Sequence, residues 1–329
     1  MAGPGMKTGA ILLLWLCAVP IAQAAQNHLL IIGGIGGTDA FRELFADRAA
    51  RIYQSAIEAG IDERNITLLS ETALPNTSQP HRLSDKPRIL QALREIGARA
   101  QVDDRVFVIL IGHGNPRGDG AAFNLPGPDI SATEFSEALV GLENQLLVIV
   151  NTASASGPFI KALSADRRIV ITATSSGREY YATLFGDYFV AAFAEAGADT
   201  DKDERVSMLE AFVFARRETR RAYENEKQLS TEHALLDDNG DGEGSRNPGE
   251  FEADGALANR VYLQQQPSLA LGAPPQLVEM MQRKHGLEQS ISNLKRQRER
   301  LPRSDYYTRL EALLVDLALL SREIRAQGD

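Results

Sequence analysis

The sequence predicts an α/β protein in which a mostly parallel sheet is covered by helices on both faces and is followed by a C-terminal helical hairpin. Apolar, β-branched runs recur at residues 29–35, 66–69, 106–111, 146–150 and 169–173. Segments with helical spacing lie between these runs, as expected when crossover connections place helices on the two faces of a parallel sheet. A proline-rich stretch and two apolar helical seams then complete the chain.

Each run fits a strand that is buried on both faces, because it is continuously apolar and does not alternate with polar residues. The segments with helical spacing between the strands cover residues 40–59, 87–100, 131–142 and 158–163. Two further helical patterns, at 188–196 and 207–223, follow the last strand. We therefore expect residues 26–263 to form one α/β domain.

The first 25 residues have the pattern of a secretory signal peptide. Lys7 precedes the apolar stretch from Ile11 to Val19, and Ala22-Gln23-Ala24 offers a cleavage site between small residues. The stretch is too short to span a bilayer and no stop-transfer pattern follows it. We expect a secreted protein without a membrane span, located in the periplasm if the source is a diderm bacterium.

Charge and glycine spacing exclude two classes of ligand. The formal net charge is −9, and an acidic protein repels nucleic acid, so we expect no nucleic-acid partner. The glycines of residues 33–37 lack the G-x-G-x-x-G spacing of a dinucleotide loop, so we expect no organic cofactor.

Reactive residues stand at the ends of two of the predicted strands. His113 and Gly114 follow the run 106–111, and Ser154 follows the run 146–150. Ligands of parallel sheets bind beyond the carboxyl ends of the strands, so we expect His113 and Ser154 side by side at one rim of the sheet.

These two strand ends resemble the legumain family of peptidases in the caspase-like clan. In that family one core strand ends in His-Gly, and the next ends in a small residue, the catalytic cysteine and a Ser-Gly pair. Residues 153–157, Ala-Ser-Ala-Ser-Gly, match the second motif with Ser154 in the position of the cysteine. The resemblance covers roughly residues 28–262. It implies a three-layer α/β/α caspase-like sandwich with a cleft that holds a peptide or protein segment.

Two departures from the family concern catalysis. The sole cysteine, Cys17, lies in the predicted signal peptide, and the position of the asparagine that orients the histidine falls near Gly36. One hypothesis is a peptidase homologue that is non-catalytic or weakly active. The alternative is a serine-dependent hydrolase with Ser154 as nucleophile, His113 as base, and the N–H groups of Gly114 and Ser154 as oxyanion donors.

An acidic loop at residues 199–210 has the spacing of an EF-hand calcium loop. Oxygen-bearing side chains occupy positions 1, 3, 5, 9 and 12, and position 7 would contribute its carbonyl oxygen. The predicted ligands of this structural calcium ion are Asp199, Asp201, Asp203, Arg205, Ser207 and Glu210. A helix cap made by Ser207 and Glu210 is the alternative, and Glu204 stands where such loops usually have glycine.

A second acidic loop has half of the same pattern. Asp237, Asn239 and Asp241 occupy positions 1, 3 and 5, and Gly242 occupies position 6, but Pro248 stands where the closing glutamate belongs. A second calcium ion and a polar surface loop are both compatible with this sequence.

The end of the chain predicts a linker and a helical hairpin. Residues 264–275 are rich in proline and small residues, which sustain neither helix nor strand. In residues 276–329 two apolar seams with coiled-coil spacing flank a Leu-Pro-Arg-Ser turn at 301–304. An isolated hairpin buries little surface, so we expect it to dock on the domain, to self-associate or to bind a protein partner.

Overall fold

The computed structural model describes residues 25–118, 120–194, 197–203, 205–249, 254–264, 275–296, 298 and 301–328. The chain divides into two compact units, and the boundary between them in the sequence lies between Leu263 and Gln264. The predicted signal peptide, apart from residue 25, and residues 265–274 of the predicted linker lie outside the described residues.

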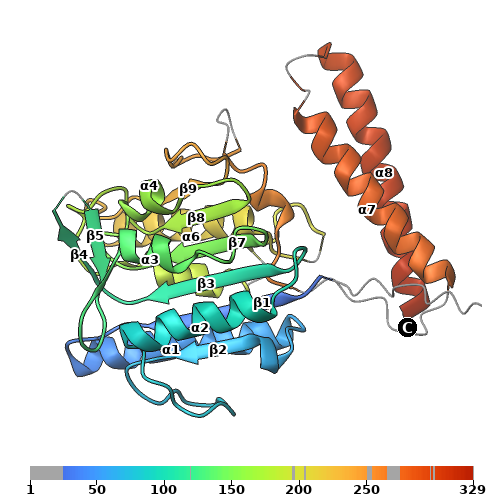
Figure 1. Cartoon of the computed structure of the whole chain (residues 1–329). Helices are drawn as coiled ribbons and strands as arrows, with labels where there is room; N and C mark the ends of the chain where they lie inside the picture. The colour runs from blue at the N-terminus through green and yellow to red at the C-terminus, as the bar shows by residue number, and fades with distance from the viewer. Residues whose placement is uncertain are drawn as a thin grey trace, which may run out of the picture. The chain divides into compact units, whose positions relative to one another are not determined.

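The first unit is built on a six-stranded sheet (Figure 1). Its strands lie in the order β2-β1-β3-β7-β8-β9, of which the first five are parallel and β9 is antiparallel to β8. This confirms the predicted mostly parallel sheet. The bounds are β1 (Asn27–Gly33), β2 (Ile66–Leu69), β3 (Arg105–Ile111), β7 (Leu146–Asn151), β8 (Arg168–Thr172) and β9 (Leu235–Asp237).

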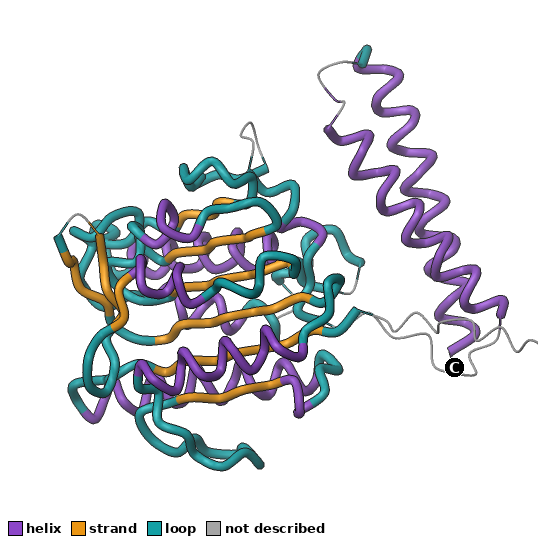
Figure 2. Tube along the Cα trace, in the orientation of Figure 1, coloured by secondary structure: helices purple, strands orange, loops and turns teal. Residues whose placement is uncertain are grey.

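Helices cover both faces of this sheet and complete the predicted three-layer α/β/α sandwich (Figures 1 and 2). Leu29 and Ile31 of β1 belong to the core of one face, and Leu30 and Ile32 to the core of the other. One face packs against α1 (Asp39–Glu58), α5 (Phe185–Ala191) and α6 (Met208–Asn225), and the other packs against α2 (Lys86–Arg99), α3 (Ala132–Ala138) and α4 (Phe159–Leu163). Two short 3-10 helices span Glu63–Asn65 and Ala258–Arg260.

Side-chain caps fix where three of these helices begin. Thr38 caps α1, Asp85 caps α2, and Ser131 forms a capping box with Glu134 at α3, so that orphan N–H groups of each first turn are satisfied. The helix predicted for 131–142 ends earlier, at Ala138, because the chain turns through Gly141 at a φ of 97°.

A small antiparallel sheet follows the carboxyl end of β3. It contains β4 (Gly114–Arg117), β5 (Gly120–Phe123) and β6 (Ile130–Ser131). Phe123 anchors it to the main sheet, because a Cβ added at Gly34 or at Gly112 would lie 2.9 Å from the Phe123 ring. The His113 carbonyl accepts a hydrogen bond from the Asn124 N–H at 3.0 Å, which ties the His113 segment to this sheet.

The second unit is a pair of helices, α7 (Pro275–Arg296) and α8 (Arg303–Gly328), that pack against each other. Ile291 and Leu294 of α7, and Tyr306 and Leu320 of α8, are buried. In the described part of the chain, no helix combines the length and the apolar character needed to cross a membrane.

Candidate functional site

Ser154 lies against the backbone of Gly114, where the neighbouring strands β3 and β7 end. Leu110 of β3 is in register with Asn151 of β7. Three residues later the Ser154 hydroxyl donates to the Gly114 carbonyl at 3.0 Å and accepts from the Gly114 N–H at 3.1 Å. Ser154 is 2% exposed. Its hydroxyl is therefore buried and has both a donor and an acceptor in the backbone of one residue.

The His113 ring is held by aromatic packing. The His113 ring packs edge-to-face against the rings of Phe41 and Phe45 in α1. Its centroid lies 4.5 Å from that of Phe41 and 4.9 Å from that of Phe45. Burial lowers the pKa of His113 below its usual value of 6.5, and the nearby positive charge of Arg48 lowers it further. Among the described residues, no hydrogen bond joins His113 to Ser154. The ring is neutral at neutral pH, and the Ser154 proton is directed to a carbonyl oxygen.

The two predicted oxyanion donors differ in availability. The Gly114 N–H already donates to Ser154 Oγ, whereas within the described part of the chain the Ser154 N–H has no acceptor. Gly114 must remain glycine, since a Cβ there would lie 2.4 Å from the Ser154 carbonyl oxygen.

The small residues after Ser154 tie the end of β7 to the turn that follows β8. Ala155 has a φ of +52°, and its N–H donates to the Glu179 carbonyl at 2.7 Å. The Ser156 and Thr174 hydroxyls are 3.1 Å apart, and the Gly157 N–H donates to Thr174 Oγ1 at 3.0 Å. The motif thus has a structural task that is independent of catalysis.

Gly36, near which the resemblance places the orienting asparagine, bonds through its backbone. Its N–H donates to Glu71 Oε2 at 2.9 Å, and Glu71 pairs with Arg42 at 3.3 Å. A Cβ at Gly36 would lie 2.5 Å from the Arg42 nitrogen. The close packing at this position therefore leaves no room for a side chain that could orient His113.

The sequence analysis did not predict a buried ion pair whose arginine acts electrostatically on His113. Arg48 of α1 is 2% exposed, and its guanidinium donates to the two carboxylate oxygens of Asp187 in α5 at 2.5 and 2.7 Å. Arg48 occupies the apolar stripe of its helix, three residues after Phe45 and four before Ile52. A charged residue in such a stripe is the signal that could have revealed a buried partner.

A second cluster missed by the sequence reasoning surrounds Glu179. Its carboxylate accepts from the N–H and the hydroxyl of Ser175 at 2.9 and 2.8 Å. The same carboxylate accepts from the His233 N–H at 3.0 Å and lies 3.0 Å from His233 Nδ1. Because the Glu179 carbonyl accepts from Ala155, this cluster is joined to the segment that carries Ser154.

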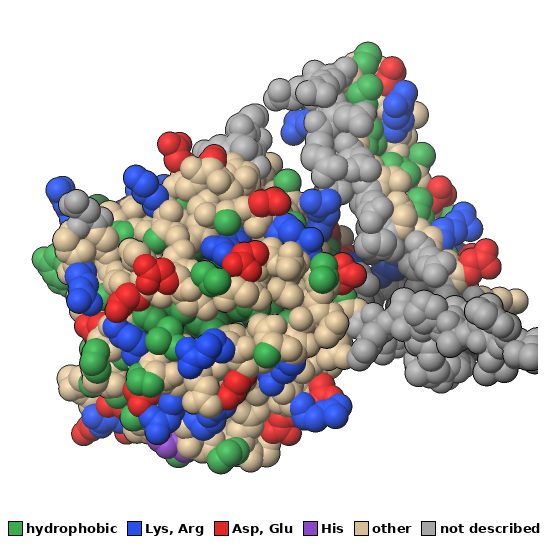
Figure 3. All heavy atoms as spheres, viewed as in Figure 1, with side chains coloured by type: hydrophobic (Ala, Val, Ile, Leu, Met, Phe, Trp, Pro, Cys, Tyr) green, Lys and Arg blue, Asp and Glu red, His purple; other side chains and the backbone are tan. Residues whose placement is uncertain are grey.

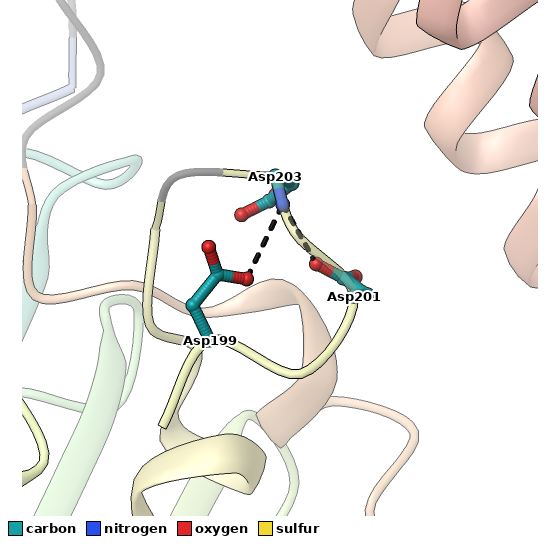
Figure 4. Close-up of side chains that lie close together, drawn as sticks. All are labelled: Asp199, Asp201 and Asp203. Carbon is teal, nitrogen blue, oxygen red and sulfur yellow. Dashed lines mark hydrogen bonds between the residues drawn. The ribbon is translucent and has the colours of Figure 1, made fainter. Parts of the chain in front are cut away.

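The first acidic loop brings its three aspartates together (Figure 4). Ligand-type oxygens of Asp199, Asp201 and Asp203 all lie within 4.8 Å of one another. Burial and the neighbouring carboxylates of Asp203, Glu210 and Asp199 raise the pKa of Asp201 from 3.8 to about 6. Such mutual repulsion is what a bound cation would relieve.

The other predicted ligands of this loop have partners of their own. Glu210 and Ser207 form a capping box at α6, in which Glu210 Oε2 accepts from the Ser207 N–H at 3.0 Å. Glu210 Oε1 accepts from the N–H and the hydroxyl of Thr200, both at 2.8 Å. Arg205 pairs with Asp203 at 2.7 Å and stacks over Tyr262 at 4.0 Å. The helix cap anticipated as the alternative is therefore present.

The second acidic loop begins inside the edge strand β9. Asp237 is 1% exposed, and its two carboxylate oxygens accept from the N–H groups of Gly240 and Gly242, each at 3.2 Å. Asn239 and Asp241 are exposed and bond to each other, with a distance of 2.9 Å from Asn239 Nδ2 to Asp241 Oδ2. These hydrogen bonds lie within the loop, and the Gly242 N–H also donates to the Ser164 hydroxyl outside it at 2.9 Å.

Charges on the face of the first unit that carries α2, α3 and α4 are mixed. Figure 3 shows acidic and basic side chains interspersed there, with no single stripe of either sign.

Comparison with known proteins supports the resemblance predicted from the strand ends. The model of the Peptidase C13 family, the legumain family, matches residues 93–236, a segment that includes His113 and Ser154. No curated protein matches the chain. Among solved structures, the crystal structure of protein GSU0716 from Geobacter sulfurreducens is similar at 11% identity, over 64% of this chain and 92% of that chain, with a TM-score of 0.43.

Proposed function

Starting from the match to the Peptidase C13 family, we propose that this protein is an exported, non-catalytic peptidase homologue that holds a peptide segment at the rim formed by the ends of β3 and β7. The observation that carries the proposal is the position of the Ser154 hydroxyl, which bonds to both polar groups of the Gly114 backbone and not to His113.

The chemistry of serine supports a non-catalytic site. A serine hydroxyl becomes a nucleophile only when a nearby base takes its proton during attack. Here the proton points at the Gly114 carbonyl, and the His113 ring is packed against two phenylalanines. Loss of the residue that orients the histidine can by itself reduce the rate by about 10⁴-fold. Gly36 offers no replacement for that residue.

Covalent labelling tests the proposal. We expect a fluorophosphonate probe to leave Ser154 unmodified, because no base activates it, and intact-mass spectrometry would then give the same mass for wild type and Ser154→Ala after treatment. A trypsin-like serine peptidase serves as the positive control. Modification of wild type but not of Ser154→Ala would overturn the proposal and establish the serine-dependent hydrolase.

A cysteine at position 154 tests whether the nucleophile alone is missing. A thiol ionises far more readily than a hydroxyl, but the neutral His113, which has no hydrogen bond to Ser154 among the described residues, does little to stabilise a thiolate. We expect Ser154→Cys to react with iodoacetamide at pH 7 no faster than a buried thiol and to cleave no peptide. Rapid alkylation of Cys at this position, abolished by His113→Ala, would show that the pair is competent.

We further propose that the loop 199–210 binds one structural calcium ion. The observation in favour is the gathering of three aspartate carboxylates with a raised pKa at Asp201. Because Glu210 is engaged in a helix cap, the aspartates would be the principal ligands. A cation that binds only the folded state stabilises it by about 2.7 kcal/mol at a hundredfold excess over Kd.

Thermal unfolding in millimolar calcium and in chelator measures this effect. We expect calcium to raise Tm by several degrees in wild type and to have no effect in Asp201→Asn. Asp103→Asn serves as the matched control, since Asp103 is an exposed carboxylate in a turn outside the loop. If the calcium response of Asp201→Asn equals that of wild type and of the control, the aspartates do not form the site.

A further inference from the structure

We infer that a cavity between α6, the end of β8 and the start of β9 is a binding site for a small apolar carboxylate. The cavity has a volume of about 270 Å³. This lies just below the range of roughly 300–1,000 Å³ for drug-sized ligands, so its ligand is a small acid or one terminal residue of a chain.

Three of the lining residues are apolar and buried. They are Ala173, Phe185 and Ala234, which lie directly after β8, at the start of α5 and directly before β9. Each of the three is at most 5% exposed. A hydrocarbon group placed against these three side chains would be removed from water, which is the main source of affinity in such pockets.

Three of the residues that line the cavity are arginines. Arg216 and Arg220 come from α6 and Arg246 comes from the loop after β9. Arg216 bonds to the carbonyl oxygen of Arg246 and to Asn247 Oδ1, which ties α6 to the loop after β9. Three guanidinium groups thus line one cavity of a chain with a net charge of −9, and guanidinium groups favour planar carboxylates.

A buried hydroxyl in the cavity lacks a partner. Thr219 is 5% exposed and lines the cavity, and its Oγ1 is buried without a hydrogen bond among the described residues. Leaving such a group unsatisfied costs about 1–3 kcal/mol. A carboxylate oxygen in the cavity would accept from this hydroxyl and remove that cost.

Two acidic groups of the described residues lie at the cavity, and each is already engaged. Glu232 lines it, but the Glu232 carboxylate accepts from the Leu184 and Phe185 N–H groups at 2.7 and 3.1 Å and from the Tyr223 hydroxyl at 3.1 Å. Burial raises the pKa of Glu232. Glu224 pairs with Arg220 at 3.5 Å, with both side chains about two-thirds exposed, so a carboxylate ligand can replace it at little cost.

The cavity is connected to the segment that carries Ser154 by hydrogen bonds, but Ser154 does not line it. His233 lines the cavity and bonds through Nδ1 to Glu179, whose carbonyl accepts from the Ala155 N–H. The site therefore does not rest on the proposed function. Ser154→Ala should leave its affinity unchanged.

Isothermal titration calorimetry with the full chain tests the inference. We expect N-acetyl-leucine to bind and N-acetyl-leucinamide, which lacks the negative charge, to bind at least tenfold more weakly. A peptide ending in leucine, with its carboxyl group free or amidated, identifies the source of the ligand. Tighter binding of the free-carboxyl peptide than of N-acetyl-leucine indicates a chain terminus, and equal binding indicates a free acid; both outcomes support the site.

Matched variants of one helix locate the binding. We expect Arg220→Gln combined with Arg246→Gln to weaken N-acetyl-leucine about tenfold, and Thr219→Val, which replaces only the hydroxyl, to weaken it severalfold. Arg221→Gln is the control, since Arg221 pairs with Glu218 and does not line the cavity. Equal affinity for acid and amide, absence of binding at millimolar ligand, or equal losses in the Arg220/Arg246 pair and in Arg221→Gln would overturn the inference, provided that circular dichroism shows folded variants.

Discussion

At the residue scale, the neutral state of His113 has a consequence for stability. Its pKa in the folded protein is below the unfolded value of about 6.5, so the folded state binds this proton more weakly than the unfolded state does. The contribution of neutral His113 to the free energy of unfolding is therefore fully present above pH 6.5. It is lost as the pH falls through the pKa that His113 has in the folded protein.

Replacing His113 by phenylalanine tests this sign. Phenylalanine keeps the ring contacts with Phe41 and Phe45 and removes the titration. We expect the unfolding free energy of wild type, relative to His113→Phe, to decrease between pH 7 and pH 5 in urea titrations. A difference that stays constant with pH would mean that the ring is as easily protonated in the folded chain as in the unfolded one.

Gly157 provides a steric prediction at the same scale. A Cβ at this position would lie 2.3 Å from the Ser175 carbonyl carbon and from the Ser176 nitrogen, and backbone atoms cannot move aside as a flexible side chain can. We expect Gly157→Ala to cost about 3 kcal/mol by forcing apart the ends of β7 and β8. Gly120→Ala, whose Cβ would be 3.7 Å from its nearest neighbour, should cost less than about 1 kcal/mol in the same denaturant titration.

Individual contacts of the site were beyond prediction from the sequence. The residue types and their order placed Gly114 and Ser154 at neighbouring strand ends. The orientation of the Ser154 hydroxyl, however, depends on backbone angles such as the positive φ of Ala155. Alanine rarely adopts such an angle, and no sequence pattern predicts it. The partner of a buried polar atom is decided by such local geometry.

At the scale of elements, the strands that are buried on both faces were the most predictable. The run 66–69 coincides with β2, and the run 106–111 misses one residue of β3. The edge strand β9 was missed because its three residues, Leu235 to Asp237, are too few to show a pattern and lead directly into an acidic loop. Its antiparallel pairing with β8 depends on contacts that are distant in the sequence.

The ion pair between α1 and α5 gives an asymmetric prediction. The Arg48 side chain is 2% exposed and that of Asp187 is 35% exposed. Asp187→Ala therefore leaves a buried guanidinium without its charged partner and, among the described residues, with only the Thr183 carbonyl as an acceptor at 3.2 Å, which should cost about 3–5 kcal/mol. Arg48→Met leaves a carboxylate that water can reach and keeps most of the apolar packing, so we expect it to cost clearly less. Equal losses in chemical denaturation would mean that the Arg48 charge is already balanced by other groups.

At the scale of the whole molecule, the division after Leu263 predicts that the first unit folds without the hairpin. Leu263 is 1% exposed and its carbonyl accepts from Asn27 Nδ2 at 2.9 Å, so the sheet unit is closed at that residue. We expect a chain ending at Gln264 to melt within about 2 °C of the full chain, as scanning calorimetry would show. A much lower Tm would mean that the sheet unit needs the hairpin.

The hairpin itself leaves apolar side chains of α8 in contact with water. Leu314, Val315 and Leu319 are 46–52% exposed, on a helix pair whose inner positions Leu294 and Leu320 are buried. Transfer of such side chains out of water contributes roughly 25 cal/mol per Å², which favours association with a second apolar helix surface. A second copy of the hairpin provides such a surface. We therefore expect the full chain to sediment as a dimer at tens of micromolar. The chain ending at Gln264, and the full chain carrying Leu314→Glu and Leu319→Glu, should sediment as monomers. If the full chain sediments as a monomer, self-association does not cover this surface, and a different protein or the first unit would be its partner.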